Sequence, residues 1–262
     1  MKKDFTAKAA AFCFLLASLA CNFLTATPQP APPTAAVATE LVIPPPTAAP
    51  APTPSDSIFY VSLDGDDANP GTFETPWRTI QHAADVLSPG ETVYVRAGTY
   101  SENVILRRSG APGAPISFAV YPGEAVILDG GGSLSSAFET DFSEPDPRAS
   151  DIRISGFTIQ NYVSFGIVGW SVNDRMTFTD LLIQHNGSEG LRLSNSDGSR
   201  VERVLLQNNE GGFDCTPILP GAETDPGCTN LYIADVQAID NGTLGDTGTD
   251  SFAVERGDHI LV

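Results

Sequence analysis

A short run of β-forming residues that ends in asparagine recurs four times in the C-terminal half of the chain. The copies are "ISGFTIQN" (154–161), "FTDLLIQHN" (178–186), "VERVLLQNN" (201–209) and "IADVQAIDN" (233–241). Their terminal asparagines lie 25, 23 and 32 residues apart: Asn161, Asn186, Asn209 and Asn241. A second apolar run follows each asparagine, and a polar turn then restarts the cycle. A repeat of this length predicts a stack of similar coils.

Each coil carries the features of short strands and not of helices. Apolar and polar residues alternate, β-branched residues are frequent, and the turns contain glycine. Coils of this size with two or three strands are typical of a parallel β-helix, in which successive coils lie about 4.8 Å apart. We therefore predict an all-β solenoid in which the four asparagines stack as a hydrogen-bonded ladder. This role is structural, so we do not expect the asparagines to be catalytic.

The segment before the repeats predicts a helical cap. In "TPWRTIQHAADVLSPG" apolar residues recur at helical spacing: Ile80, Ala83, Ala84 and Leu87. We expect a short amphipathic helix over Thr79–Leu87 that covers the open first coil, as repeat stacks require. Four strand-like runs follow it: "TVYVRAG", "NVILRR", "PISFAVY" and "AVILDGG".

Residues 1–21 have the composition of an export signal. A basic start that contains all three lysines of the chain precedes the apolar run 9–20, which is too short to span a bilayer. The sequence "SLAC" resembles a lipobox, in which Cys21 would be lipidated and become the new N-terminus. Ordinary cleavage after Ala20 is the alternative.

Residues 22–56 predict an extended spacer. This segment holds ten of the chain's 21 prolines, together with many alanines and threonines, and such a composition cannot bury a core. The folded domain is therefore expected over residues 57–262. We expect the protein outside the cell or at the cell surface, in contact with a membrane only through its lipid anchor.

The charge of the chain excludes one class of partner. Beyond the signal, eleven arginines and no lysine stand against 31 acidic residues, which gives about −20 with histidine neutral. Nucleic acid is excluded as a partner because a phosphate-binding surface must be basic. A polyanionic sugar would also be repelled unless cations bridged the two. Calcium is the natural candidate for an exported acidic protein.

Two cysteines remain once Cys13 in the signal and Cys21 in the lipobox are set aside. An exported setting permits a disulfide between Cys215 and Cys228. It would close the loop "CTPILPGAETDPGC", which we expect at the surface. In the chain-entropy model this closure stabilises the fold by up to ~3 kcal/mol.

The N-terminal half resembles a known module. The run "FYVSLDGDDANPGTFETPWRTIQHAADVLSPGETVYVRAGTYSENVIL" and its continuation "SGAPGAPISFAVYPGEAVILDG" resemble the opening module of right-handed β-helix proteins in the pectate-lyase-like superfamily. The resemblance implies a single-stranded right-handed parallel β-helix. The superfamily includes lyases of several polysaccharides, so the architecture alone does not fix the reaction.

The most similar enzymes in that superfamily are the calcium-dependent pectate lyases of polysaccharide lyase family nine. Their calcium is held by aspartates in an "ADGFA" and a later "SDDGWD" segment. Here "TDSFA" (249–253) resembles the first segment and makes Asp250, with Asp246 nearby, a candidate ligand. In another alignment "NEGGFD" (209–214) resembles the second segment and offers Glu210 and Asp214. An ordinary turn is the alternative for each of these acidic residues.

The chemistry of such lyases explains why these residues matter. They remove the proton next to a uronate carboxylate and then expel the glycosidic oxygen, and calcium makes that proton more acidic. The family base is a lysine, which this chain lacks beyond its signal. Because a guanidinium keeps its proton at ordinary pH, we expect Arg192 and Arg256 to bind substrate carboxylates and not to act as the base.

The sequence therefore predicts an exported β-helix protein that acts on or binds extracellular polysaccharide. A calcium-dependent uronate lyase is the leading hypothesis. The alternative is a non-catalytic surface module that binds carbohydrate or has a structural role, and a glycoside hydrolase is a third interpretation. Because the last residues are apolar and no cap follows them, we also expect residues 57–262 to be the N-terminal part of a longer β-helix.

Overall fold

The computed structural model describes residues 58–141, 149–170, 172–216, 227–242 and 252–254. Its strands form two parallel sheets, which we call the large sheet and the small sheet. The large sheet contains β1 (Ile58–Val61), β2 (Thr92–Val95), β3 (Gly98–Tyr100), β5 (Ile116–Val120), β6 (Val126–Asp129), β8 (Ile152–Ser155), β9 (Thr158–Gln160), β11 (Thr177–Gln184), β13 (Arg200–Gln207) and β15 (Tyr232–Ile239). The small sheet contains β4 (Val104–Leu106), β7 (Phe138–Thr140), β10 (Ile167–Val168), β12 (Glu189–Ser194), β14 (Gly211–Thr216) and β16 (Phe252–Val254).

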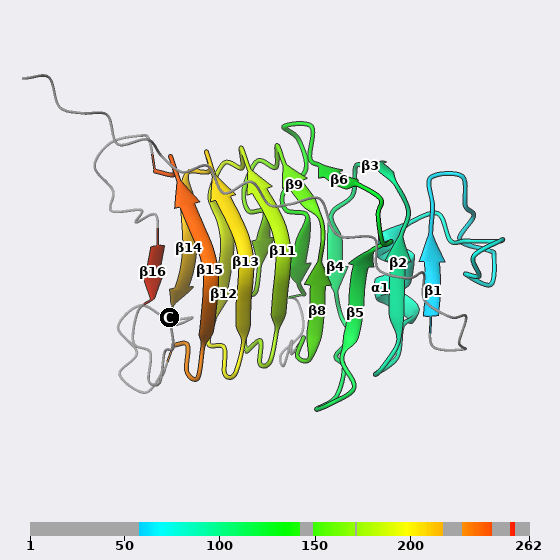
Figure 1. Cartoon of the computed structure of the whole chain (residues 1–262), viewed down its shortest axis with the longest axis horizontal. Coiled ribbons are helices and arrows are strands. Elements are labelled where there is room, and N and C mark those ends of the chain that lie inside the picture. Colours follow the sequence, from blue (N-terminus) through cyan, green and yellow to red (C-terminus); the bar gives the residue numbers. More distant parts are fainter. Residues whose placement is uncertain (1–57, 142–148, 171, 217–226, 243–251, 255–262) are drawn as a thin grey trace, which may run out of the picture. The chain divides into compact units, whose positions relative to one another are not determined.

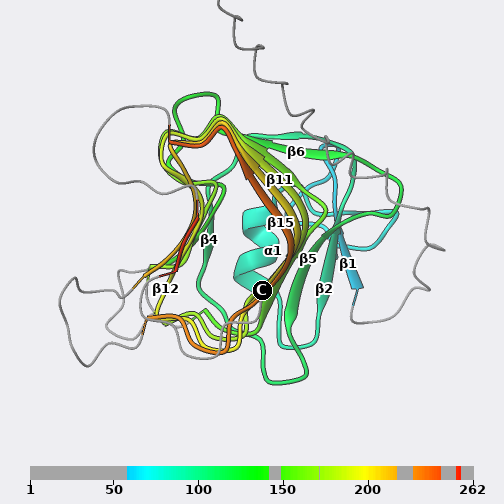
Figure 2. The ribbon, with the colours of Figure 1, turned by 60° about the vertical axis from the view of Figure 1, so that its left-hand side comes forward.

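Each turn of the chain contributes strands to both sheets, which makes the domain a parallel β-helix. Strand β11 pairs with β13 and β13 with β15 in the large sheet, while β12 pairs with β10 and β14 in the small one. The strands stand side by side along the stack in Figure 1, and Figure 2 shows the two sheets on opposite sides of the coil. The prediction of an all-β parallel solenoid is confirmed.

The coils bend at fixed positions where a residue other than glycine often has a positive φ. One such column occupies the middle of the long strands, through Gly156, Asp180, Arg203 and Asp235. A second column closes the turn after these strands, through Asn161, His185, Asn208 and Asp240. Polar residues that tolerate the left-handed conformation account for most of these positions.

The asparagine ladder is present but is shorter than predicted. Asn186 Nδ2 donates to Asn209 Oδ1 at 2.9 Å, and Asn209 Nδ2 donates to Asn241 Oδ1 at 3.1 Å. Each Oδ1 also accepts a backbone N–H, as Asn186 Oδ1 does from Tyr162 at 3.0 Å. The strand register aligns Asn186 with Tyr162, so the prediction that Asn161 belongs to the ladder is wrong. Asn161 instead donates to Asp129 at 3.2 Å.

The predicted helix is α1 (Ile80–Val86). Thr79 is its N-cap and accepts a hydrogen bond from the His82 N–H, while Leu87 is the C-cap residue. The Glu102 carboxylate accepts from the first two helical N–H groups, at 3.1 and 2.9 Å. The helix buries Ile80, Ala83 and Ala84 and packs against β4. Its role as a cap stays a prediction. No helix in the described ranges is long and apolar enough to cross a membrane.

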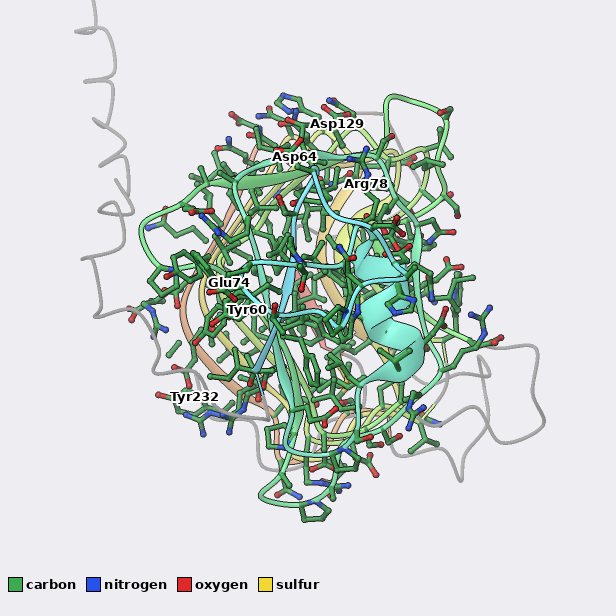
Figure 3. The ribbon with its side chains drawn as sticks, turned by 90° about the vertical axis from the view of Figure 1, so that its right-hand side faces the viewer. Tyr60, Asp64, Glu74, Arg78, Asp129 and Tyr232 are labelled. Carbon is green, nitrogen blue, oxygen red and sulfur yellow. A yellow bond between two sulfur atoms is a disulfide. The ribbon has the colours of Figure 1, made fainter. Side chains whose placement is uncertain are left out.

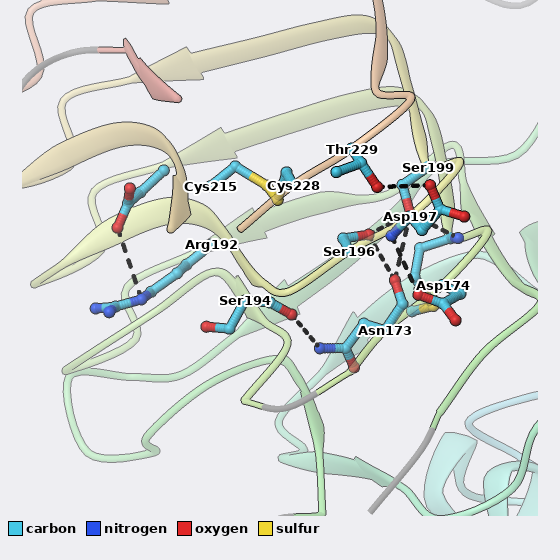
Figure 4. The surroundings of a disulfide bond; sticks show 12 residues. Asn173, Asp174, Arg192, Ser194, Ser196, Asp197, Ser199, Cys215, Cys228 and Thr229 are labelled. Carbon is cyan, nitrogen blue, oxygen red and sulfur yellow. Dashed lines mark hydrogen bonds and ion pairs between the residues drawn. A yellow bond between two sulfur atoms is a disulfide. The ribbon is translucent and has the colours of Figure 1, made fainter. Parts of the chain in front are cut away.

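The core is one continuous cluster inside the coils. It contains aromatic rings in tilted and edge-to-face contact, such as Phe118, Phe138 and Phe157, with centroids 5.8 Å apart in each successive pair. The predicted Cys215–Cys228 disulfide is formed, with Cα atoms 5.9 Å apart (Figure 4). Both cysteines are 0% exposed and belong to this core, whereas residues 217–226 of the loop that we expect at the surface lie outside the described residues.

Substitution of Asn209 tests the energetic role of the ladder. In Asn209→Ala the backbone N–H and Nδ2 of buried Asn186 lose their acceptor, which we expect to cost about 3 kcal/mol. A domain of this size should then melt roughly 6–12 °C lower in a calorimetric or circular dichroism scan.

The neighbouring Asn208 supplies a matched control. Its φ is 54° and its side chain is exposed, so glycine suits this position. Asn208→Gly should change the melting temperature far less than Asn209→Ala. Equal effects of the two substitutions would contradict a ladder-specific contribution.

Candidate functional site

The candidate site is the outer face of the small sheet. Phe138, Ile167, Leu191 and Phe213 share one register column and are buried in the core. Because successive side chains of a strand alternate between faces, the next column points outward. That column contains Glu139, Val168, Arg192 and Asp214. Parallel strand pairing thus places an arginine between carboxylates that are far apart in the sequence.

Arg192 is the central cation of this face. Its Nη1 lies 3.8 Å from Glu189 Oε1, and its Nε lies 3.6 Å from Asp214 Oδ2 (Figure 4). These contacts are long for ion pairs. Five other arginines (Arg96, Arg107, Arg175, Arg200 and Arg203) each approach a carboxylate to 2.9 Å or closer. Arg192 Nε is buried and makes no hydrogen bond within the described part of the chain. The guanidinium therefore keeps capacity to bind a further anion.

One aromatic side chain lies beside the arginine, and a second packs against the first. The Arg192 guanidinium carbon is 5.9 Å from the centroid of the Phe165 ring, within the range of a cation–π contact. The Phe165 ring meets the Trp170 ring edge to face, at a centroid distance of 5.2 Å and an angle of 88°. The Trp170 N–H of the backbone donates to Thr140 Oγ1 at 2.9 Å, which ties this segment to β7. The face thus combines one cation with an aromatic wall.

The outer face of the small sheet also contains Glu139, a carboxyl group with a raised pKa. Burial raises its pKa above the ordinary glutamate value; the Asn103 and Ser136 side chains lower it in part, and the charge of Asp141 raises it. Glu139 stands two strands from Arg192 in the outward column, a distance of about 10 Å at the usual strand spacing. A carboxyl group with a raised pKa keeps its proton to higher pH than an ordinary glutamate, which favours a role as a proton or hydrogen-bond donor to a sugar oxygen.

The predicted metal ligands are only partly assembled in the described structure. Asp214 lies on β14 and contacts Arg192, whereas Glu210 is exposed just before that strand. Across the residues that the structure describes, no group of three His, Cys, Asp or Glu side chains is arranged to hold a metal. Asp246, Asp250 and Arg256 lie outside the described residues, as does Cys21. The carboxylates in view therefore do not make a calcium site by themselves.

The sequence identified Arg192 and Asp214 but missed their neighbours. Glu139 belongs to no motif, and Phe165 and Trp170 border the second apolar run that follows Asn161, so only the register of β7, β10 and β12 shows that they share a face with Arg192. The signal that was available is the alternation within each strand. It marks Glu139 as outward, but it does not reveal which strand lies next to it.

Comparison with known proteins fits this architecture. Residues 59–216 match the family described as "Pel9A-like, right handed beta helix region", which is more than half of the chain. The chain belongs to this family. The solenoid is therefore a right-handed parallel β-helix, and the resemblance to pectate-lyase-like proteins is confirmed.

Individual relatives agree with the family. The chain is 28% identical over 158 residues to pectate lyase PEL9 of Emericella nidulans, covering 59% of this chain and 34% of the relative. It is 40% identical over 107 residues to the uncharacterized protein YwoF of Bacillus subtilis (strain 168), covering 41% of this chain and 23% of that protein. The matched region thus spans about a third or less of each relative.

Two solved structures have the same fold. The structure of pectate lyase Pel9A superimposes with a TM-score of 0.52 at 20% identity, over 73% of this chain and 56% of that chain. A rhamnogalacturonan lyase also gives a TM-score of 0.52, at 17% identity over 78% of this chain and 61% of that chain. At these identities the similarity establishes the shared fold alone.

The raised pKa of Glu139 leads to a pH-dependent prediction. Because the folded protein binds this proton more tightly than the unfolded chain, the contribution of Glu139 is most favourable at low pH and is lost as pH rises through the folded pKa. Glu139→Gln retains a neutral group at every pH. The melting temperature of the variant relative to wild type should therefore rise between pH 4 and pH 7.

The outward Glu202 offers a control of opposite sign. Hydrogen bonds from Arg200 lower its pKa, so Glu202→Gln should lose stability relative to wild type as pH rises. A pH-independent difference for Glu139→Gln would show that its carboxyl is not perturbed.

Proposed function

We propose that the protein binds uronate-containing polysaccharide along the outer face of the small sheet, with Arg192 as the group that holds a sugar carboxylate. The observation that carries this proposal is the loose coordination of Arg192. Its nearest carboxylates are 3.6 and 3.8 Å away, so its N–H groups have room to form shorter hydrogen bonds to a ligand.

The surroundings of Arg192 suit a sugar chain. Trp170 is partly exposed and offers apolar ring surface, and buried Phe165 supports it edge to face, while polar groups nearby can fix the orientation of a ligand. The strands of the small sheet are stacked along the solenoid, so this face runs along the stack and accommodates an extended polymer. The two curated relatives of the family that carry a functional name are called pectate lyases, which supports the same substrate class.

The proposal also includes a reaction on the bound polysaccharide. The leading reaction is elimination from a uronate polymer, as the names of the relatives suggest, and a glycoside hydrolase is the less favoured reaction. Within the described site, Arg192 holds the carboxylate and Glu139 offers a proton to an oxygen of the sugar chain. A guanidinium does not act as a base at ordinary pH, so we assign no proton abstraction to Arg192.

A non-catalytic carbohydrate-binding module is the second candidate. The observation that favours it is that the given sequence contains no lysine beyond Lys8, since lysine is the base of the similar lyases. The two candidates differ in one measurement. Elimination creates an unsaturated product with an ultraviolet absorbance, and a binding module creates none.

Export and lipid attachment through Cys21 complete the proposal. The apolar run that ends at Cys21 and the proline-rich segment behind it support this location. When the protein is made in a bacterial host, wild type should fractionate with membranes and Cys21→Ser should be released. Equal fractionation of the two forms would exclude lipidation.

Substitution of Arg192 tests the binding site directly. Loss of a charge-assisted hydrogen bond to a sugar carboxylate should weaken the binding of tetragalacturonate to Arg192→Ala about tenfold to a hundredfold. Isothermal titration calorimetry measures this change.

Arg200 on the large sheet is the matched control. Its side chain is 49% exposed, against 30% for Arg192, and donates to Glu202, so Arg200→Ala removes the same charge from another face. The affinity of the Arg200→Ala protein for tetragalacturonate should stay close to that of wild type. A similar loss in both variants would indicate a general charge effect and not a site at Arg192.

Calcium binding is proposed on the acidic residues, with no reaction step assigned to it. If Asp250 with Asp246, or Glu210 with Asp214, contributes to a calcium site, the ion will stabilise the native state. At a hundredfold excess over Kd the gain is about 2.7 kcal/mol. The melting temperature should therefore rise with millimolar calcium but not with equal magnesium, and Asp250→Asn should reduce the shift. A melting temperature indifferent to calcium would contradict this part of the proposal.

A further inference from the structure

The outer face of the large sheet contains a hollow that the proposed function does not use. One outward register column of this sheet runs through Tyr60, Tyr94, Ala119, Ser155 and Thr179. Its first two members are large rings with centroids 6.2 Å apart, and the next two are small. Where the column changes from tyrosine to alanine and serine, a hollow of about 380 Å³ remains above the sheet. This volume lies within the range of small-molecule sites.

Aromatic rings form one wall of this hollow. The Tyr94 and Tyr121 rings meet edge to face, with centroids 5.9 Å apart and an angle of 82°. The segment Tyr121–Glu124 borders the hollow, Gly156 contributes to its floor, and Asp180 lies at its far end. Further rings continue the aromatic surface toward the N-terminal coil, where the Tyr60 and Phe73 rings meet edge to face with their centroids 5.3 Å apart. Figure 3 shows Tyr60 close to Glu74 at that end of the column.

The aromatic wall is held in place by a partly buried network. The Phe73 and Tyr121 rings are 5.9 Å apart, and the Arg96 guanidinium lies over both of them, 4.6 and 4.8 Å from their centroids. It also makes a bidentate contact with Glu124, through Nε and Nη2 at 2.9 and 2.7 Å from Oε1. This network fixes the Tyr121 ring before any ligand arrives, which reduces the entropy cost of binding.

The charges around the hollow are already paired. Glu124 is bound to Arg96, and Asp180 receives bidentate hydrogen bonds from Arg203 at 2.6 and 3.0 Å. The arginines at its border are thus committed to carboxylates at short distance, in contrast to Arg192 on the small sheet. A ligand here meets aromatic rings, a serine hydroxyl and the remaining acceptor capacity of two carboxylates. No cation is among the residues that line the hollow, and Arg153, two residues before Ser155 on β8, is exposed outside that lining.

We propose that this hollow is a second carbohydrate site, which takes a neutral segment of a glycan chain. The apolar face of a pyranose ring packs against Tyr94 and Tyr121, since ring C–H groups meet the negative face of an aromatic ring. The sugar hydroxyls donate to the carboxylates of Glu124 and Asp180, which accept several hydrogen bonds each. A uronate is disfavoured because its carboxylate would face these acceptors in a strongly acidic protein.

The second site is independent of the first. It lies on the large sheet, and Arg192 lies on the small sheet across the coil (Figure 2). A polysaccharide with neutral and acidic stretches would then be held by two faces of one solenoid. Failure of either site leaves the other untouched, so the two proposals are separately testable.

Filling the hollow tests the proposal without loss of a contact. Ala119→Phe extends the tyrosine column into the space, and aromatic residues suit an outward strand position. Ala234→Phe is the matched control, because Ala234 occupies the same outward column four strands away on β15. Tyr94→Ala removes the wall itself. The full-length protein is titrated by calorimetry with cellotetraose, xylotetraose and β-1,4-galactotetraose as neutral probes, and with tetragalacturonate as the acidic probe.

We expect at least one neutral probe to bind wild type, Ala234→Phe and Arg192→Ala with similar Kd. Ala119→Phe and Tyr94→Ala should weaken that binding by about tenfold or more, a change that calorimetry resolves clearly. Tetragalacturonate affinity should not change in Ala119→Phe. The proposal is overturned if none of the neutral probes binds up to roughly 10 mM, which is weaker than typical weak ligands. It is also overturned if the folded Ala119→Phe protein binds the neutral probe as wild type does.

Discussion

The backbone hydrogen bonding between successive coils is the constraint on which the rest of this structure depends. Parallel pairing fixes which residue of one coil lies against which residue of the next, as Leu191 lies between Ile167 and Phe213. A shift of one residue would move every core side chain to solvent. The same register that builds the aromatic core also sets the outward columns, so core and surface chemistry are decided together.

The turns are stabilised by polar contacts that repeat from coil to coil. Residues with positive φ occupy equivalent positions, and their side chains are one strand spacing apart. Arg175 therefore reaches Asp151, and Arg203 reaches Asp180, through paired hydrogen bonds within a column. Inside the coil, Asn186, Asn209 and Asn241 satisfy buried backbone groups in the same way. Polar contacts between coils thus stabilise the turns, and apolar contacts between coils stabilise the strands.

The two outer faces differ in how their charges are satisfied. On the large sheet Arg96, Arg200 and Arg203 are held by carboxylates at short distances. On the small sheet Arg192 stands between two carboxylates that are farther away and beside an aromatic ring. On this difference rests our proposal of an acidic-sugar site on the small sheet and a neutral-sugar site on the large sheet. The family to which the chain belongs supports carbohydrate as the common ligand class.

The sequence by itself determined the architecture, because alternation within strands, the repeat length and the helical spacing before Leu87 are local patterns that are legible in one chain. It also determined the disulfide, since Cys215 and Cys228 are the cysteines that remain after the signal region. Only the tertiary structure decided that Asn161 lies outside the ladder, that the disulfide is buried and that Glu139 shares a face with Arg192. The physical reason is the inter-coil register, which depends on hydrogen bonds between residues more than twenty positions apart, as the Arg200–Thr177 pairing illustrates. Turn lengths differ from coil to coil, so no count along the chain fixes those partners in advance.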